Sequence, residues 1–169
     1  MAGAAVSVGL SEIEGLARIL NGVKLSSQDR VQLLENLGAE LESQTQERFD
    51  TKKDPEGKPW QALAQKTRDY YREHFPQAQP PLVIDGGLRD SIESQVSGWS
   101  VLTGATKIYA AIHQFGGEIV PKKAGALFVP GYGMLKKVTI PARPYLGISS
   151  ENAADIVLNV QRFLAGQFK

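Results

Sequence analysis

Cysteine is absent from this chain of 169 residues, and histidine occurs only twice. The missing thiols exclude disulfide frameworks, cysteine-ligated zinc, iron–sulfur clusters and thiol nucleophiles together. Apolar runs extend over at most four or five residues, whereas a membrane-spanning helix needs roughly 18. The first residues, Met1–Val6, lack the basic region and the apolar core of a signal peptide. We therefore expect a soluble protein made in the cytosol.

The sequence also contains few motifs for catalysis, metal binding or phosphate binding. A catalytic histidine needs a positioned carboxylate and a nucleophile, and the apolar surroundings of His113 supply neither. His74 and His113 do not have the spacing of two zinc ligands on one helix. No Gly-Lys-Ser/Thr phosphate loop is present, and Asp85 followed by two glycines fits a capped turn instead. The sequence predicts a protein that is not an enzyme, with no catalytic residue, cofactor or metal.

Charge is distributed unevenly along the chain. Residues 1–93 carry 11 basic and 15 acidic side chains, a net charge of −4. Residues 94–150 carry six basic side chains and a single acidic one, Glu118, a net charge of +5. Opposite charges in different regions suit contacts with oppositely charged surfaces, although a soluble domain also tolerates such an asymmetry.

Helical periodicity predicts four helices. They extend from the capping box Ser11–Glu14 to Val23, from Ser26-Ser27 to Phe49, over residues 63–70, and from Ser149-Ser150 to Leu164. Between the second and third helices, the turn-rich residues 50–59 deliver Trp60, which we expect to be buried against the first helices.

Alternation of period two predicts short strands. They are Val6–Leu10, Ile92–Val96, Trp99–Leu102, Lys107–Ile112 and Val138–Ile140. The sequence thus predicts a single α+β domain over residues 1–169, in which N-terminal helices and a C-terminal helix pack on a small, mainly antiparallel sheet. Residues 118–137, rich in glycine, proline and lysine, predict a flexible loop: either a long hairpin or an arm that orders only against a partner.

The basic and aromatic residues of the second half permit another interpretation. Lys122-Lys123 and Lys136-Lys137 lie near the two ends of one loop and could contact a phosphate backbone, non-specifically and with strong salt dependence. Aromatic residues at alternating strand positions more often belong to a core. A nucleic-acid-binding module that uses the lysine-rich region 118–143 is therefore the alternative function.

Four sequence blocks carry a family resemblance. In order, they are Arg48-Phe49 with Asp54–Trp60, then Asp85–Ile92, then Gly104-Ala105 with Tyr109–Gly117, and finally Pro141–Gly147. The ordered set resembles the bacteriophage virion-morphogenesis family, which comprises tail-completion proteins and the G protein of Mu-like phages. The motif residues to which the resemblance assigns a structural role are Trp60, Gly87, Leu88, Arg89, His113, Phe115, Gly116 and Pro144.

The resemblance implies a structural virion protein, made in the bacterial cytoplasm, that completes the tail or neck and helps to join head to tail. Its expected partners are copies of itself in a ring, a hexamer or similar, and other neck, connector and tail proteins, with non-specific contact to packaged DNA and none to a membrane. The candidate interface residues are Lys122, Lys123, Lys136, Lys137, Val138, Ile140, Arg143 and Tyr145. Arg143 is the expected centre, because a guanidinium can fork onto a neighbour's carboxylate.

Overall fold

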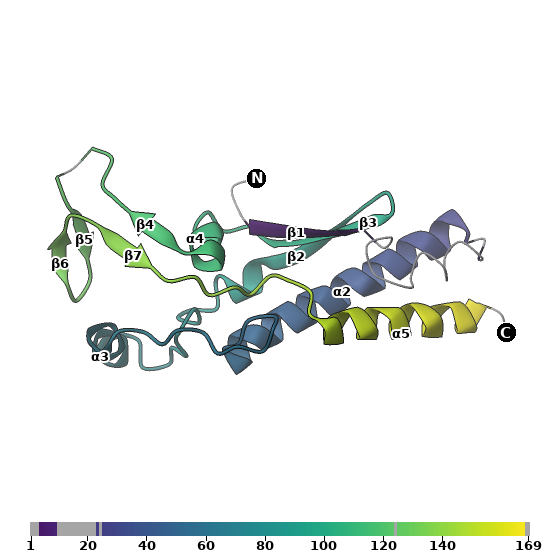
Figure 1. Cartoon of the computed structure of the whole chain (residues 1–169), viewed down its shortest axis with the longest axis horizontal. Helices are drawn as coiled ribbons and strands as arrows, with labels where there is room; N and C mark the ends of the chain where they lie inside the picture. Colours follow the sequence, from purple (N-terminus) through teal and green to yellow (C-terminus); the bar gives the residue numbers. More distant parts are fainter. Residues whose placement is uncertain (1–3, 10–22, 24, 124, 168–169) are drawn as a thin grey trace.

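The computed structural model describes residues 4–9, 23, 25–123 and 125–167. Two long helices, α2 (Ser27–Thr51) and α5 (Ser150–Gln167), lie side by side along one half of an elongated molecule (Figure 1). A three-stranded antiparallel sheet packs beside α2, and an arm of short strands forms the opposite end. The predicted α+β fold is confirmed, whereas the first predicted helix, from Ser11–Glu14 to Val23, lies almost entirely outside the described residues.

Local signals at its ends define α2. The Ser26 hydroxyl accepts a hydrogen bond from the backbone N–H of Asp29 at 3.1 Å, which satisfies a free N–H of the first turn. The helix ends where Lys52 adopts a left-handed conformation with φ of 58°. The predicted apolar stripe is buried from Leu34 onward, but Val31, which we expected in that stripe, is 41% exposed.

The sheet has the order β1-β3-β2, formed by β1 (Ala4–Gly9), β3 (Ser100–Ala105) and β2 (Ile92–Ser97). Helix α2 approaches β2 closely at Gly38. A Cβ at that position would lie 3.0 Å from the Cβ of Ser94, and the Ser94 hydroxyl donates to the Gly38 carbonyl at 3.0 Å. A side chain larger than glycine would therefore have to displace Ser94 or move the helix from the sheet.

The buried apolar residues form two clusters. One joins α2, α5 and the sheet through Leu33, Leu34, Leu37, Leu41, Val101, Ile156, Val160 and Leu164. The other surrounds the C-terminal end of α2 and contains Ala4, Phe49, Trp60, Leu88, Ile92, Ala105, Ala110, Tyr145 and Leu146. The second cluster draws on all four sequence blocks.

The strand predicted over Lys107–Ile112 is wrong. A bend after β3 leads instead into the short helix α4 (Ala110–Phe115), in which the buried residues Ala110 and Gln114 are four positions apart. Such a spacing puts both side chains on one helical face. The third predicted helix is confirmed as α3 (Gln65–His74), and a 3₁₀ turn, η2 (Arg89–Ser91), precedes β2.

Residues 117–140 form what we call the arm. Strand β4 (Gly117–Ile119) pairs antiparallel with β7 (Val138–Ile140), and further out β5 (Leu127–Val129) pairs with β6 (Gly133–Leu135). The arm is thus a long hairpin, the first of the two forms that the sequence left open. Its end is held on α3, because the hydroxyls of Tyr132 and Thr67 lie 2.9 Å apart.

Replacing Gly38 by valine should lower the free energy of unfolding by about 1–3 kcal/mol, because the added carbons must displace Ser94 or move α2 from the sheet. The control is Ala39→Val, at an exposed position of the same helix, which introduces a valine without the clash and should cost at most about 0.7 kcal/mol through its lower helix propensity. Urea unfolding curves measure both. Equal stability of the two variants would contradict the close approach.

Candidate functional site

The sequence-predicted site residues divide into an interior group and an exposed group. The interior group surrounds residues 141–147, which we call the closing block, an irregular segment that leads from β7 to α5. The exposed group lies mainly on the arm, and Phe115 at the end of α4 is exposed as well.

Arg48, in the last turn of α2, makes the most extensive contact with the closing block. Its guanidinium donates to the carbonyls of Tyr145 at 2.7 Å and Gly147 at 3.0 Å, and to Oδ1 of Asn152 at 2.5 Å. Burial lowers the pKa of Arg48, while the charges of Asp54 and Glu47 raise it. The charge is therefore held mainly by neutral oxygens, an arrangement that the forked guanidinium permits.

Gln114 of α4 fixes the same segment from another side. Its Oε1 accepts from the backbone N–H groups of Tyr145 and Leu146, both at 3.0 Å, and its Nε2 donates to the Leu146 carbonyl at 3.0 Å. The buried side-chain amide thus satisfies two backbone N–H groups and one backbone carbonyl that would otherwise lack partners. We did not single out Gln114 from the sequence, although it lies within the third block.

Trp60 is buried as predicted. Its Nε1 donates to the Pro144 carbonyl at 2.8 Å, and its ring meets Phe49 edge-on with centroids 5.6 Å apart. Tyr145 is fully buried and also packs on Phe49, with ring centroids 5.2 Å apart, and its hydroxyl donates to the Ala110 carbonyl. Burial raises the pKa of the Tyr145 hydroxyl, so it stays protonated.

Arg143 requires a correction. Only 4% of it is exposed, its Nε donates to the Gln61 carbonyl at 2.9 Å, and its backbone N–H donates to the carbonyl of His113 at 2.8 Å. Burial lowers the pKa of Arg143. Neither Arg143 nor Tyr145 presents the exposed interface contact that we expected, because both side chains are used inside the subunit.

The remaining motif residues mostly hold turns. Leu88 is buried, and Arg89 forms an exposed ion pair with Asp90. Gly116 has φ of 70°, and a Cβ there would lie 2.7 Å from the backbone nitrogen of Ala142, so its position requires glycine. Phe115 differs from the structural role expected for it, because 72% of it is exposed.

Two further motif residues complete this group. The backbone N–H of Gly87 donates to the Asp85 carboxylate at 2.9 Å, which closes the turn before Leu88. His113 is half-buried, and burial, followed by the charge of Arg143, lowers its pKa. A neutral His113 fits the structural role that the sequence predicted.

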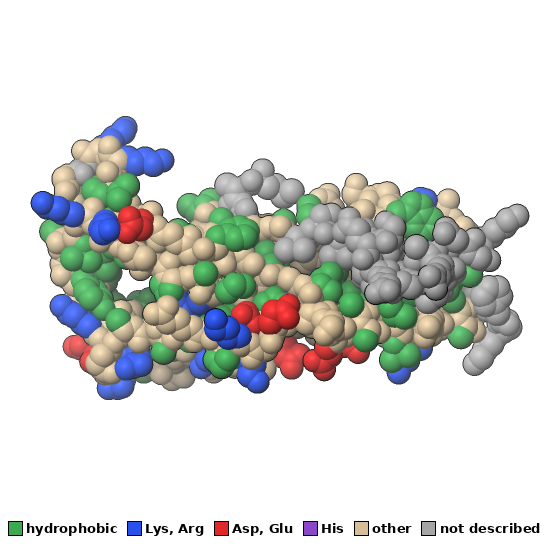
Figure 2. Space-filling model, in the orientation of Figure 1, with side chains coloured by type: hydrophobic (Ala, Val, Ile, Leu, Met, Phe, Trp, Pro, Cys, Tyr) green, Lys and Arg blue, Asp and Glu red, His purple; other side chains and the backbone are tan. Residues whose placement is uncertain are grey.

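The arm carries the exposed group. Lys122, Lys123 and Lys136 are exposed, and Lys137 Nζ pairs with the Glu118 carboxylate at 2.7 Å. Val138 and Ile140 are half-buried in the pairing of β7 with β4. Figure 2 shows several Lys and Arg side chains at the end of the molecule where the arm lies.

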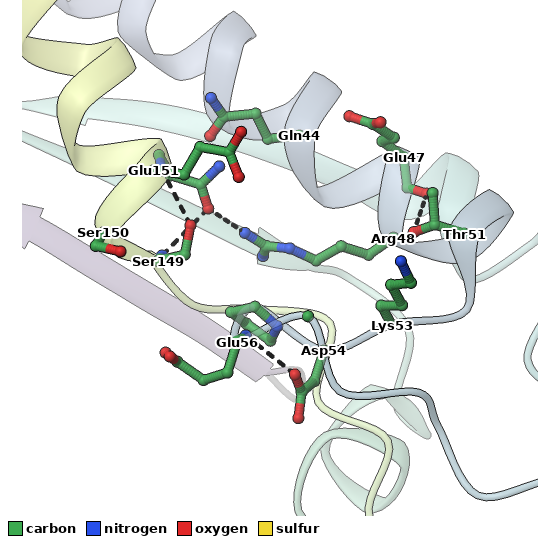
Figure 3. Close-up of a pocket in the computed structure, with 13 residues that line it drawn as sticks. Gln44, Glu47, Arg48, Thr51, Lys53, Asp54, Glu56, Ser149, Ser150 and Glu151 are labelled. Carbon is green, nitrogen blue, oxygen red and sulfur yellow. Dashed lines mark hydrogen bonds between the residues drawn. The ribbon is translucent and has the colours of Figure 1, made fainter.

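A pocket of about 370 Å³ lies where the end of α2, the turn after it and the start of α5 meet (Figure 3). Four carboxylates line this acidic pocket, together with Lys53 and the buried Arg48: Glu47, Asp54, Glu56 and Glu151. The sequence did not reveal it, because its walls come from three distant segments. The lining suits a cationic group, since four carboxylates outnumber two bases.

Other kinds of site find no support among the described residues. No group of three His, Asp or Glu side chains is placed there to hold a metal ion. In the same part of the chain, no helix has the length and apolar character needed to cross a membrane.

Comparisons with known proteins identify relatives. The model of the phage virion morphogenesis family matches residues 11–165. The chain is 32% identical over 123 residues to the G protein of Escherichia phage Mu, which is named as a capsid assembly protein; the match covers 71% of this chain and 70% of that relative. The Mu-like prophage FluMu G protein 2 of Haemophilus influenzae is 36% identical over 83 residues, 49% of this chain and 51% of that relative. No solved structure matches.

Arg48→Met should destabilise the subunit by about 3 kcal/mol, because the buried carbonyl of Tyr145 and the partly buried carbonyl of Gly147 lose a charged donor. Arg162→Met, an exposed position on α5, is the control and should stay within about 0.5 kcal/mol of the parent. Chemical unfolding measures both variants. A small and equal effect of the two substitutions would show that the hydrogen bonds from Arg48 to the closing block contribute little to stability.

Arg143→Glu should prevent stable folding, because a carboxylate would then be buried opposite the Gln61 carbonyl without a donor. Lys123→Glu makes the same charge change at an exposed arm position and should leave the circular dichroism spectrum and the melting temperature nearly unchanged. A well-folded Arg143→Glu subunit would contradict the interior role.

Proposed function

Because this chain belongs to the phage virion morphogenesis family, we propose that it completes the tail or neck of the particle and joins head to tail as a ring of identical subunits. Family membership supports a role in building the particle. The tail or neck as its station, the ring, and a virion location after synthesis in the host cytoplasm are parts of the proposal.

The observation that best supports assembly is the exposure of large apolar side chains on the arm and at α4. Phe128 and Met134 are opposite each other on the arm and are 71% and 65% exposed. Ile108, before α4, and Phe115, its last residue, are 83% and 72% exposed. Exposed apolar patches of this kind mark contact surfaces. A subunit of a larger assembly would bury these side chains against its neighbours.

The same reasoning supports action by assembly without catalysis. The strongly buried polar groups Arg48, Gln114 and Arg143 all hydrogen-bond to the protein's own backbone. They hold the subunit together, and no reacting group is required to explain their burial. In the proposed particle the partners are further copies of the chain and the neck, connector and tail proteins.

Exposed lysines on the arm favour one second candidate, a nucleic-acid-binding module that uses residues 118–143. Lys122, Lys123 and Lys136 could neutralise phosphates, whereas the buried Arg143 could not. Such binding would weaken steeply with salt. In the proposed particle, the same lysines would permit non-specific contact with packaged DNA.

Particles made without this protein should appear in electron micrographs as separate heads and tails, and supplying the intact protein should restore joined, infectious particles. A variant supplied in the same way, Ala39→Val at an exposed position, should restore them equally. Joined and infectious particles in the absence of the protein would contradict the proposal. Tight duplex binding at physiological salt, with a steep salt slope, would favour the second candidate instead.

A further inference from the structure

The outer hairpin of the arm has one exposed apolar face. Phe128 and Met134 are directly opposite each other in the pairing of β5 with β6, so their side chains lie on the same face. Both are more than half exposed. A two-stranded hairpin is only marginally stable in water unless something packs against it. Its turn is held on α3 through Tyr132, which leaves the Phe128–Met134 face for a partner.

The arm that carries this face also carries positive charge. Among the ion pairs of the described residues, Lys137 is the arm lysine that takes part, through Glu118. Lys122, Lys123 and Lys136 are exposed and have no carboxylate within ion-pair distance in that part of the chain. The partner of the arm should therefore be acidic, because complementary charge orients two surfaces as they meet.

The acidic pocket carries the complementary, negative charge. Glu47, Glu56 and Glu151 are exposed at its walls, and none of them joins an ion pair with a described residue. Figure 3 shows them on different sides of the opening, contributed by α2, the turn and α5. With Asp54, Lys53 and Arg48 counted, the pocket carries four negative and two positive charges, a net charge of −2.

We propose that the arm of one subunit lies across the acidic pocket of a second copy of this chain, with its lysines at the pocket and Phe128 and Met134 covered by the neighbour. This contact deepens the proposed ring and rests on it. The outer hairpin lies at one end of the molecule, whereas the end of α2 and the start of α5, which line the pocket, lie nearer its middle (Figure 1), and the arm is bound to its own α3. The pocket that receives it therefore belongs to another copy.

Such a contact uses two different surfaces, so every subunit offers one arm and one pocket. A head-to-tail contact of this kind repeats from subunit to subunit, and it closes into a ring when the rotation between neighbours permits. The apolar pair supplies buried area, while the charges fix which surfaces meet.

The lack of cysteine allows a direct test by disulfide trapping. Full-length Lys122→Cys or Lys136→Cys protein is mixed with Glu56→Cys protein under mild oxidation, both as purified protein and in particles, and covalent dimers are quantified on non-reducing gels. Dimers should form at least about tenfold faster than with Glu93→Cys, an exposed glutamate on β2, because docking raises the effective concentration of the two thiols.

A charge exchange provides the second measurement. The pair Lys122→Glu with Lys136→Glu should reduce self-association seen by light scattering, as should Glu47→Lys with Glu56→Lys, and all four substitutions together should restore it. The control pair Lys107→Glu with Arg162→Glu, both exposed, should leave it unchanged.

The outcomes separate this contact from the ring itself. Suppose that the parent protein assembles, but trapping at Glu56 is no faster than at Glu93 and the charge exchange has no effect. The arm–pocket contact would then be wrong, while the proposed ring would be unaffected. If the parent protein stays monomeric both in solution and in particles, the ring fails and the contact fails with it.

Discussion

The guanidinium of Arg48 is the interaction on which the rest of the subunit depends. It joins the end of α2 to the closing block and, through Asn152, to the first turn of α5. A buried guanidinium without acceptors would be strongly unfavourable, so the closing block must lie where it does for the charge to be tolerated. Asn152 also exchanges hydrogen bonds with Ser149 at the start of α5, so the residue that accepts from Arg48 is part of the cap of that helix. The same interaction therefore holds the start of α5 against α2.

The four sequence blocks meet in space around this interaction. Phe49 and Trp60 contact the closing block from α2 and the turn, and Gln114 contacts it from α4. The four blocks that carry the family resemblance thus mostly build the interior of the subunit in this chain. Of the two surfaces in the proposed contact, the arm lies beyond the third block from Glu118 onward, whereas the pocket includes Arg48, Asp54 and Glu56 of the first block.

Features with local causes could be predicted from the sequence. The caps at Ser26 and Ser149 and the apolar periodicity fix α2 and α5, and short alternation fixes β2, β3 and β7. The segment Lys107–Ile112 was misassigned because a short apolar run fits a strand and a buried helical turn equally well.

Features with distant causes could not be predicted. Arg143 was expected at an interface because a guanidinium can fork onto a neighbour's carboxylate, whereas its acceptor in the structure, the Gln61 carbonyl, is 82 residues away. Gln114 was not singled out, since its partners lie 31 and 32 residues further on. The acidic pocket has walls from α2, the following turn and α5, which only the folded chain brings together.

The long sequence separation of the Arg48 contacts determines how the subunit can form on the ribosome. Residue 48 is synthesised early, but its carbonyl acceptors follow 97 and 99 residues later. During that interval the guanidinium must stay hydrated, so the second apolar cluster cannot close while the chain is still being translated towards residue 147. The arm, residues 117–140, is made before the Ser149–Asn152 wall of the pocket. For the proposed contact, this order of synthesis means that a nascent chain has an arm before it has a completed pocket.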